Sequence, residues 1–173
     1  MRIPKIIKRI KMAKKEKIEK TNAMRQLDTA GIHYSISEYE YDESDLSGEH
    51  VAEALGKSEE EIFKTLVTHS NTGEYFVFVI PVAAELSLKK AASVAGVKKI
   101  EMIHVKELFP LTGYVRGGCS PIGMKKQFTT YIDETAILYD EIYVSAGKRG
   151  EQIIINGEKL AEFINASFAD ITV

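Results

Sequence analysis

The sequence predicts an α/β (α+β) fold in which small helices surround a curved, mixed β-sheet. Short runs typical of strands alternate with short amphipathic helices, and no repeat or low-complexity stretch interrupts this alternation. The chain has 173 residues, of which 45% are hydrophobic and 28% charged, as in an ordinary globular domain. We therefore expect one folded domain over residues 21–173, preceded by a basic N-terminal extension, residues 1–20.

Short helices are expected where a capping residue precedes an apolar stripe and a glycine follows it. The first begins at Thr21 or Asn22 and ends at Ala30, just before Gly31. The others are predicted over residues 49–55, 58–61 (a single turn), 87–95, 105–109 and 158–166. Pro110 is expected to end the helix over residues 105–109, because proline cannot continue a helical hydrogen-bond pattern.

Strands are expected where β-branched and aromatic residues gather between turn residues. The run over residues 75–80 is apolar throughout, as is typical of a strand buried on both faces. Asn71, Thr72 and Gly73 supply the turn that joins this run to the strand before it. The predicted strands cover residues 33–41, 63–68, 75–80, 99–102, 128–132, 141–145 and 152–155.

Charge is distributed unevenly along the chain. Residues 1–20 contain nine Lys/Arg and two Glu, a net charge of +7, whereas the remaining residues carry a net charge of −9. The basic extension could attract nucleic acid. It could equally be a loose tail, or an upstream stretch before a start at Met12, and the general looseness of termini favours this second interpretation.

Several protein classes are disfavoured by the composition. The sequence contains no long apolar run, so we expect no transmembrane helix, and the basic N-terminus is not followed by the apolar core of a secretory signal. Cys119 is the only cysteine, which allows no internal disulfide and favours a reducing, cytoplasmic setting. The four histidines show no zinc-site spacing, so we expect neither a metal nor a cofactor.

Residues 116–126 form the most distinctive stretch, which we call the glycine segment. Gly117, Gly118, Pro121 and Gly123 exclude a helix or a central strand and therefore predict a loop. Its bare backbone N–H groups could form a nest that binds an anion or a carbonyl oxygen. The spacing matches neither a Walker phosphate loop nor a nucleophile elbow. A second glycine turn, residues 145–150, is expected to be a hairpin that carries basic residues.

Two side chains are candidates for chemistry. Lys64 interrupts an otherwise apolar strand, so it either protects a sheet edge or enters a pocket where it stabilises an oxyanion or phosphate. Cys119 could be a nucleophile only with a base beside it, and no histidine lies nearby in sequence. A passive role for this thiol is favoured.

Six short blocks occur in a fixed order along the chain. They are FKTL (63–66), PVA (81–83), LKK (88–90), TGY (112–114), GGCSPIGMKK (117–126) and YVSAGKRG (143–150). This ordered set, which spans nearly everything from residue 21 onward, resembles the YbaK/EbsC-type family, the bacterial Cys-tRNA(Pro)/Cys-tRNA(Cys) deacylases. The resemblance implies the editing-domain fold that is also inserted in bacterial prolyl-tRNA synthetases.

The resemblance also implies a reaction and its partners. Members of the family remove cysteine that prolyl-tRNA synthetase has attached to its tRNA by mistake, since a pocket cannot strongly reject a near-isostere. The chemistry is substrate-assisted: the cysteine thiol attacks its own carbonyl and leaves as a cyclic thiolactone. The implied partners are therefore the 3′ end of a mischarged tRNA and a prolyl-tRNA synthetase, and no cofactor is needed.

The matched positions carry the family's site roles onto this chain. Lys64 matches the pocket lysine and is expected near the terminal phosphate or the ester oxygen. The remaining matched positions, expected to bind substrate through backbone donors, hydroxyls or shape, are Tyr39, Thr65, Gly117, Gly118, Ser120, Pro121 and Ser145. Gln152 is a departure, because an acidic residue is expected there in some members, and any role that needs negative charge at this position is in doubt.

The acidic body is unusual for a protein that binds tRNA. Paired basic residues could form a local basic rim, or affinity could come from a synthetase partner. The paired residues are Lys89, Lys90, Lys98, Lys99, Lys125, Lys126, Lys148 and Arg149. The alternatives that stay open are an Ala-tRNA(Pro) deacylase, a non-catalytic module that binds nucleotides or protein, and a hydrolase that uses Cys119.

Overall fold

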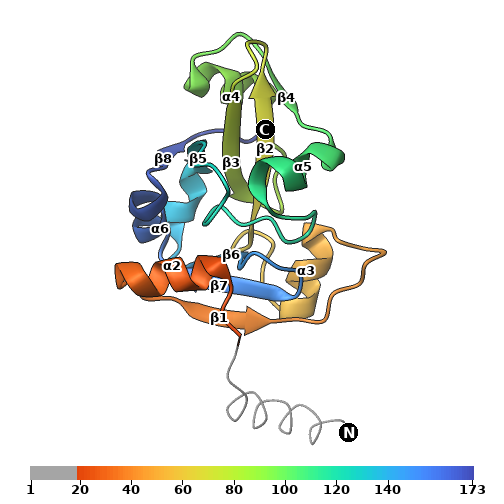
Figure 1. Cartoon of the computed structure of the whole chain (residues 1–173), viewed down its shortest axis with the longest axis vertical. Coiled ribbons are helices and arrows are strands. Elements are labelled where there is room, and N and C mark those ends of the chain that lie inside the picture. Colours follow the sequence, from red (N-terminus) through yellow and green to blue (C-terminus); the bar gives the residue numbers. More distant parts are fainter. Residues whose placement is uncertain (1–18) are drawn as a thin grey trace, which may run out of the picture.

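The computed structural model describes residues 19–173, so most of the predicted basic extension lies outside the described residues. The strands form two sheets (Figure 1). The first is antiparallel, with β7 (Glu151–Ile155) between β1 (Ser35–Glu38) and β6 (Ile142–Ser145). The second contains, in order, β4 (Ile100–Met102), β2 (Phe63–Ser70), β3 (Tyr75–Pro81), β5 (Thr129–Asp133) and β8 (Ser167–Ala169).

The predicted mixed α+β architecture is confirmed, with the difference that the sheet is divided in two. In the larger sheet β2 pairs antiparallel with β3 and β4, whereas β3, β5 and β8 run parallel. A single parallel bridge between Ile62 and Tyr143 joins the sheets, and the Tyr143 N–H donates to the Glu61 carbonyl at 3.0 Å. The largest apolar cluster takes side chains from both sheets and from α2 (Asn22–Ala30) and α6 (Gly157–Ile164), so the two sheets share one core.

Four of the helices begin at a side-chain cap. In α2, α3 (Gly48–Leu55), α4 (Leu88–Ala95) and α6, the cap oxygen accepts a backbone N–H three residues on. The cap residues are Thr21, Ser47, Ser87 and Asn156. Residues 58–61, expected to form a helical turn, form a non-helical turn, and the short 3₁₀ helix η1 (Glu134–Leu138) and strand β8 were not predicted.

The predicted end of one helix at Pro110 is wrong. Helix α5 spans Val105–Thr112 and passes through the proline. Proline removes the N–H that would bond to the Lys106 carbonyl, but the turn after it is held by the Thr112 hydroxyl, which donates to the Leu108 carbonyl at 2.7 Å. The helix ends at Gly113, whose left-handed backbone and bond to the Phe109 carbonyl close the last turn.

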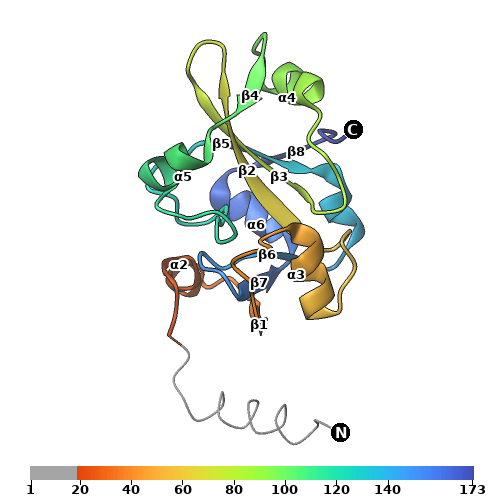
Figure 2. The ribbon, with the colours of Figure 1, turned by 90° about the vertical axis from the view of Figure 1, so that its right-hand side faces the viewer.

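The hairpin β2–β3 is confirmed and is the central element of the larger sheet. Strand β3 is buried from Phe76 to Pro81, as expected of a strand covered on both faces. Figure 2 shows the hairpin rising from the level of α3 toward α4, with α5 beside it. The positions of α3 and α5 along β2 determine where the candidate site lies.

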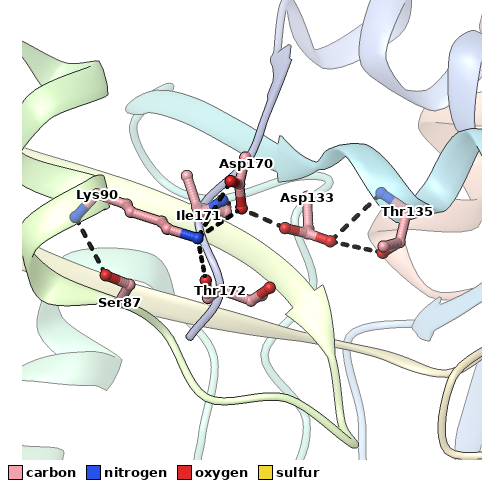
Figure 3. A network of polar contacts seen from close by, with 7 residues as sticks. All are labelled: Ser87, Lys90, Asp133, Thr135, Asp170, Ile171 and Thr172. Atoms are coloured by element: carbon pink, nitrogen blue, oxygen red, sulfur yellow. Dashed lines mark hydrogen bonds and ion pairs between the residues drawn. The ribbon is translucent and has the colours of Figure 1, made fainter.

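A polar network fastens the C-terminal segment beside the hairpin (Figure 3). Lys90 Nζ donates to both carboxylate oxygens of Asp170, at 3.0 and 3.1 Å, and to the Thr172 carbonyl at 2.8 Å. The buried Asp133 carboxylate accepts the Ile171 N–H at 3.3 Å and also two bonds from Thr135. These contacts join α4, β5 and the C-terminus. None of the residues that make them lines the cavity described below. Across residues 19–173, no helix has the length and apolarity needed to cross a membrane.

Candidate active site

A cavity of about 350 Å³ lies between β2, α3, α5 and the glycine segment. In Figures 1 and 2, α3 and α5 flank the strand, and the chain that follows α5 runs between them. The cavity is mainly apolar, with a few polar groups, as is typical of a small-ligand site. Its lining residues are Leu46, Gly48, Val51, Ile62, Phe63, Lys64, Thr65, Leu66, Val67, Val82, Met102, Ile103, Val105, Leu108, Arg116, Gly117, Cys119, Ser145 and Gln152.

The cavity follows an unpaired edge of β2. Beyond the bridge at Ile62, the side of β2 away from β3 has no strand partner among residues 19–173 until β4 begins to pair at Thr68. The carbonyl of Val67 accepts the Ile103 N–H at 3.3 Å, which closes this gap at its far end. Thr65 lies in the middle of the gap. Both interpretations of Lys64 are therefore compatible, because Lys64 lies on a sheet edge and lines a cavity.

The charge of the cavity is positive. Among the described residues that form the lining, Lys64 and Arg116 are the cationic side chains, and none is an aspartate or a glutamate. Within residues 19–173, Lys64 makes no ion pair or side-chain hydrogen bond. A lysine without a counter-charge beside an apolar wall is available to an anionic or developing negative group of a ligand.

Two buried polar atoms in the same cavity also lack partners. They are Thr65 Oγ1 and Gln152 Oε1, and only one further buried side-chain atom within residues 19–173, Glu151 Oε2, is in the same state. Buried polar groups in folded proteins are nearly always paired, so the wall at Thr65 and Gln152 can still accept a hydrogen-bond partner. Ser145 is the register partner of Gln152 in β6, and its Oγ accepts the Gly147 N–H at 3.2 Å.

Glu151 lies next to Gln152 on β7 and is 4% exposed. Its register partner on β1 is Glu38, and its Oε1 lies 3.6 Å from Lys148 Nζ. Burial raises the pKa of the Glu151 carboxyl; Lys148 opposes this shift and Glu38 adds to it. Position 152, where the resemblance implies an acidic residue in some members, is thus preceded by a buried acidic residue that lies outside the cavity lining.

The glycine segment contributes less to the cavity than its sequence suggests. Gly117 lines it, but Gly118, Ser120 and Pro121 do not. The Gly118 N–H, expected to donate to the substrate, donates instead to the Val115 carbonyl at 3.0 Å. The Ser120 hydroxyl is fully buried and accepts the Ile122 N–H at 3.2 Å.

Gly118 is explained by close packing against the second glycine turn. A Cβ at this position would lie 3.1 Å from the Arg149 backbone nitrogen and 3.2 Å from the Lys148 Cα. The Arg149 Nε also donates to the Arg116 carbonyl at 2.9 Å. The two glycine-rich stretches therefore form one packed unit, although the sequence predicts two separate loops.

Tyr114 holds this unit together, although sequence inspection assigned it no role. Its hydroxyl donates to the Ile122 carbonyl. A Cβ on Gly123 would lie 2.9 Å from the hydroxyl oxygen, and one on Gly147 would lie 2.9 Å from the ring. Burial raises the pKa of Tyr114 to about 12, so the phenol stays protonated and remains a donor. The TGY block is the sequence feature that could have indicated this role, since its tyrosine lies two residues before the glycine segment.

The structure places Tyr39 outside the cavity lining. Its N–H donates to the Gly150 carbonyl at 2.9 Å, which ties the chain after β1 to the second glycine turn. Cys119 does line the cavity, but burial raises the pKa of its thiol to about 12. A thiol that stays protonated at neutral pH is poorly suited to act as a nucleophile.

The apolar walls were not predicted from the sequence. They come from α3 and the residue before its cap, from α5, and from β2, which supplies Phe63, Leu66 and Val67. Gly48 permits this arrangement, because a Cβ there would lie 2.5 Å from the Val82 side chain. No group of three or more His, Cys, Asp or Glu side chains within residues 19–173 is arranged to hold a metal ion.

The chain belongs to the aminoacyl-tRNA editing domain family, whose model matches residues 44–163. A relative from Enterococcus faecalis is 52% identical over 161 residues, which cover 93% of this chain and 98% of the relative. That relative is provisionally named Cys-tRNA(Pro)/Cys-tRNA(Cys) deacylase EbsC. The resemblance inferred from the ordered blocks is thereby confirmed.

Solved structures support the same fold. The hypothetical protein APE2540 superposes with a TM-score of 0.79 at 23% identity, covering 86% of this chain and 97% of that one. A protein described provisionally as a trans-editing enzyme for prolyl tRNA synthetase superposes with a TM-score of 0.76 at 24% identity, covering 90% and 99%. At such low identity these similarities establish the shared fold alone.

Proposed function

We propose that this protein is a trans-editing deacylase that removes cysteine from mischarged tRNA(Pro), with Cys-tRNA(Cys) as a second substrate. The observation that carries the proposal is the unpartnered Lys64 beside the buried, unpaired Thr65 Oγ1 and Gln152 Oε1. These groups line a small, mainly apolar cavity on an editing-domain fold. They suit a ligand that combines a short side chain with an ester and an ammonium group.

The proposed step needs no nucleophile from the protein. The substrate thiol attacks its own ester carbonyl carbon, a C–S bond forms, and the C–O bond to the ribose breaks. The thiol proton ends on the departing ribose oxygen, and the resulting cyclic thiolactone is later opened by water. Lys64 stabilises the negative charge that develops on the carbonyl oxygen. A preorganised cation is most effective at this electrostatic stabilisation in a site that contains little water.

The unpaired polar atoms would orient the aminoacyl group. Gln152 Oε1 can accept from the α-ammonium group, and the hydroxyls of Thr65 and Ser145 can donate to the ester or the ribose. Gly117 offers backbone at the same wall, while the proposed contributions of Gly118, Ser120, Pro121 and Tyr39 become indirect, through the shape of the wall. A neutral Gln152 leaves the cavity positive, which favours the phosphate end of the substrate.

Binding of tRNA by an acidic protein needs a local basic surface. Residues 89–126 contain eight Lys/Arg and two Glu, a net charge of +6, and this stretch includes α5 and the glycine segment. Of the paired lysines, Lys90 and Lys99 form ion pairs with Asp170 and Glu101, whereas Lys125 and Lys126 end the glycine segment and would supply basic charge near α5. Association with prolyl-tRNA synthetase would supply further affinity, and we place this activity in the cytoplasm, where tRNA is charged.

The proposal is tested by deacylation of Cys-tRNA(Pro), Cys-tRNA(Cys) and Ala-tRNA(Pro), with trapping of the thiolactone. We expect release of cysteine and not of alanine, because alanine lacks the attacking thiol. Cys119→Ala should retain at least half of the wild-type rate. Absence of release from all three substrates refutes the enzyme, and rapid release of alanine favours the Ala-tRNA(Pro) alternative.

A further inference from the structure

An exposed apolar surface continues outward from the cavity along α5. It consists of Met102, Val105 and Phe109, with Lys125 beside Phe109, and we call it the α5 rim. The exposed fractions are 62% for Val105 and 56% for Phe109, unusually high for such side chains. Met102 and Val105 also line the cavity, so the α5 rim and the candidate active site form one continuous surface.

The geometry of the α5 rim combines an aromatic ring with a cation. Lys125 Nζ lies 5.1 Å from the centre of the Phe109 ring, within the range of a cation–π contact. A Cβ on Gly113 would lie 3.4 Å from the Lys125 stem, and the Lys125 N–H donates to the Thr112 carbonyl at 3.1 Å. Lys125 is thus held over the end of α5, and within residues 19–173 it makes no ion pair.

We propose that the α5 rim binds the unpaired nucleotides that precede the terminal adenosine of the tRNA, an inference that rests on the proposed function. Aromatic rings next to cations are the usual platform for single-stranded nucleic acid, because every base has a face that can stack. A base stacks on Phe109 and the neighbouring phosphate pairs with Lys125. Arg116, exposed at the cavity mouth, is the next cation along the same path.

The spacing agrees with this occupant. Val105, at the cavity, and Phe109 are four residues apart on one helix face, which is about 6 Å along the axis. Stacked nucleotides advance about 3.4 Å each. When the aminoacylated adenosine occupies the cavity, the one or two nucleotides before it therefore reach Phe109.

The first test measures binding without catalysis. The probes are a fluorescent RNA minihelix with a 3′ ACCA overhang and the same minihelix without its last three nucleotides. Phe109→Ala should weaken binding of the complete probe about tenfold and leave binding of the shortened probe unchanged. Phe109→Tyr should bind like wild type and Phe109→Leu like Phe109→Ala, because stacking needs a ring. Lys125→Ala should reduce the slope of log Kd against log salt concentration by about 0.7.

The second test compares two substrates. Phe109→Ala should lower kcat/KM for Cys-tRNA(Pro) about tenfold through KM, and change cysteinyl-adenosine, which lacks the preceding nucleotides, less than twofold. Leu138→Ala removes another exposed side chain, 77% exposed on η1, and should affect neither substrate.

These tests separate the inference from the proposed function. If wild type cleaves no aminoacyl ester, the proposed function fails, and the minihelix comparison still decides the role of the α5 rim. Equal losses on both substrates, equal binding of both probes, or full rescue by Phe109→Leu each overturn the inference. If Phe109→Leu restores full activity and Phe109→Ala no longer binds prolyl-tRNA synthetase, the α5 rim is a protein contact.

Discussion

The glycine segment and the strand wall formed by β2 and β7 face the same cavity, yet they use their polar groups in opposite ways. In the glycine segment, the Gly118 N–H and the Ser120 hydroxyl are engaged by neighbouring backbone groups. On the strands, Lys64, Thr65 Oγ1 and Gln152 Oε1 have no partner within residues 19–173. These polar groups of the glycine segment are thus hydrogen-bonded locally, whereas those on the strands are available to a ligand.

This difference follows from how each region is stabilised. A strand satisfies its backbone through its neighbours, so the sheet can hold an unpaired side chain in place. A loop has no such ladder, and its backbone and hydroxyl groups must be satisfied locally. We therefore expect changes on the strands to alter activity with little effect on stability, and changes in the glycine segment to do the reverse.

The largest effect is expected for Lys64→Met. Loss of this cavity lysine should lower kcat/KM for Cys-tRNA(Pro) at least about 100-fold, the scale of removing one preorganised electrostatic contact. The free energy of unfolding should change by less than about 0.5 kcal/mol, because Lys64 has no partner to lose. Lys57→Met, an exposed site just before β2, is the matched control. A loss below threefold would contradict the assigned role of Lys64.

Tyr114→Phe should show the opposite behaviour. The variant leaves the Ile122 carbonyl without its buried donor, and we expect a loss of about 1–3 kcal/mol in unfolding free energy, measured by urea denaturation. Under conditions where the variant is folded, its kcat should stay within threefold of wild type. A tenfold loss of activity at unchanged stability would show that the glycine segment takes part in the chemistry.

Gln152→Met is predicted to separate activity from stability on the strand wall. It removes an amide that has an unpaired buried oxygen, so stability should be equal or higher, while kcat/KM falls about tenfold. Gln152→Glu keeps the acceptor and adds a negative charge, which should lower activity most for the complete tRNA substrate. If Gln152→Met destabilises the fold, Gln152 has a structural partner and the comparison fails at this position.

The smallest effect is expected for Glu151→Gln and depends on pH. Burial raises the pKa of Glu151 in the folded state, so the native protein binds more protons than the unfolded chain above the ordinary value of 4.5. Stability contributed by this group is therefore lost as pH rises through that window. Glu151→Gln should be the more stable form at pH 7, by less than about 2 kcal/mol, and the advantage should vanish below pH 4.5.

The comparison of wild type and Glu151→Gln cancels the titration of every other group. A less stable variant at pH 7 would mean that the Lys148–Glu151 ion pair outweighs burial. Chemical denaturation of both forms at several pH values between 4 and 8 distinguishes the two outcomes.

Most elements could be predicted because their signals are local. Caps such as Ser87 and turn residues such as Gly73 act within a few positions, and the predicted helices and strands mostly agree with the structure. The exceptions depend on distant contacts. Strand β8 is only three residues long and exists through its pairing with β5. Helix α5 passes Pro110 because its last turn is closed by other groups.

The candidate site was predicted in part. Lys64, Thr65, Gly117 and Ser145 were selected from matched blocks and do line one cavity. Gly118, Ser120 and Pro121 belong to the packed glycine unit and Tyr39 is hydrogen-bonded to it, an arrangement that no single stretch could reveal. Its packing depends on the approach of two loops about 30 residues apart, and the sequence records only that both contain glycine.

By itself, the sequence determined the family, the order of elements and the lysine that lines the cavity, because each is encoded in contiguous residues whose chemistry is local. The tertiary structure alone decided which polar groups remain free. Whether Gly118 binds a ligand or its own chain, and whether Gln152 is satisfied, depends on neighbours supplied by other elements. The unpaired edge of β2 has the same origin, since only sheet pairing shows which backbone has no partner strand.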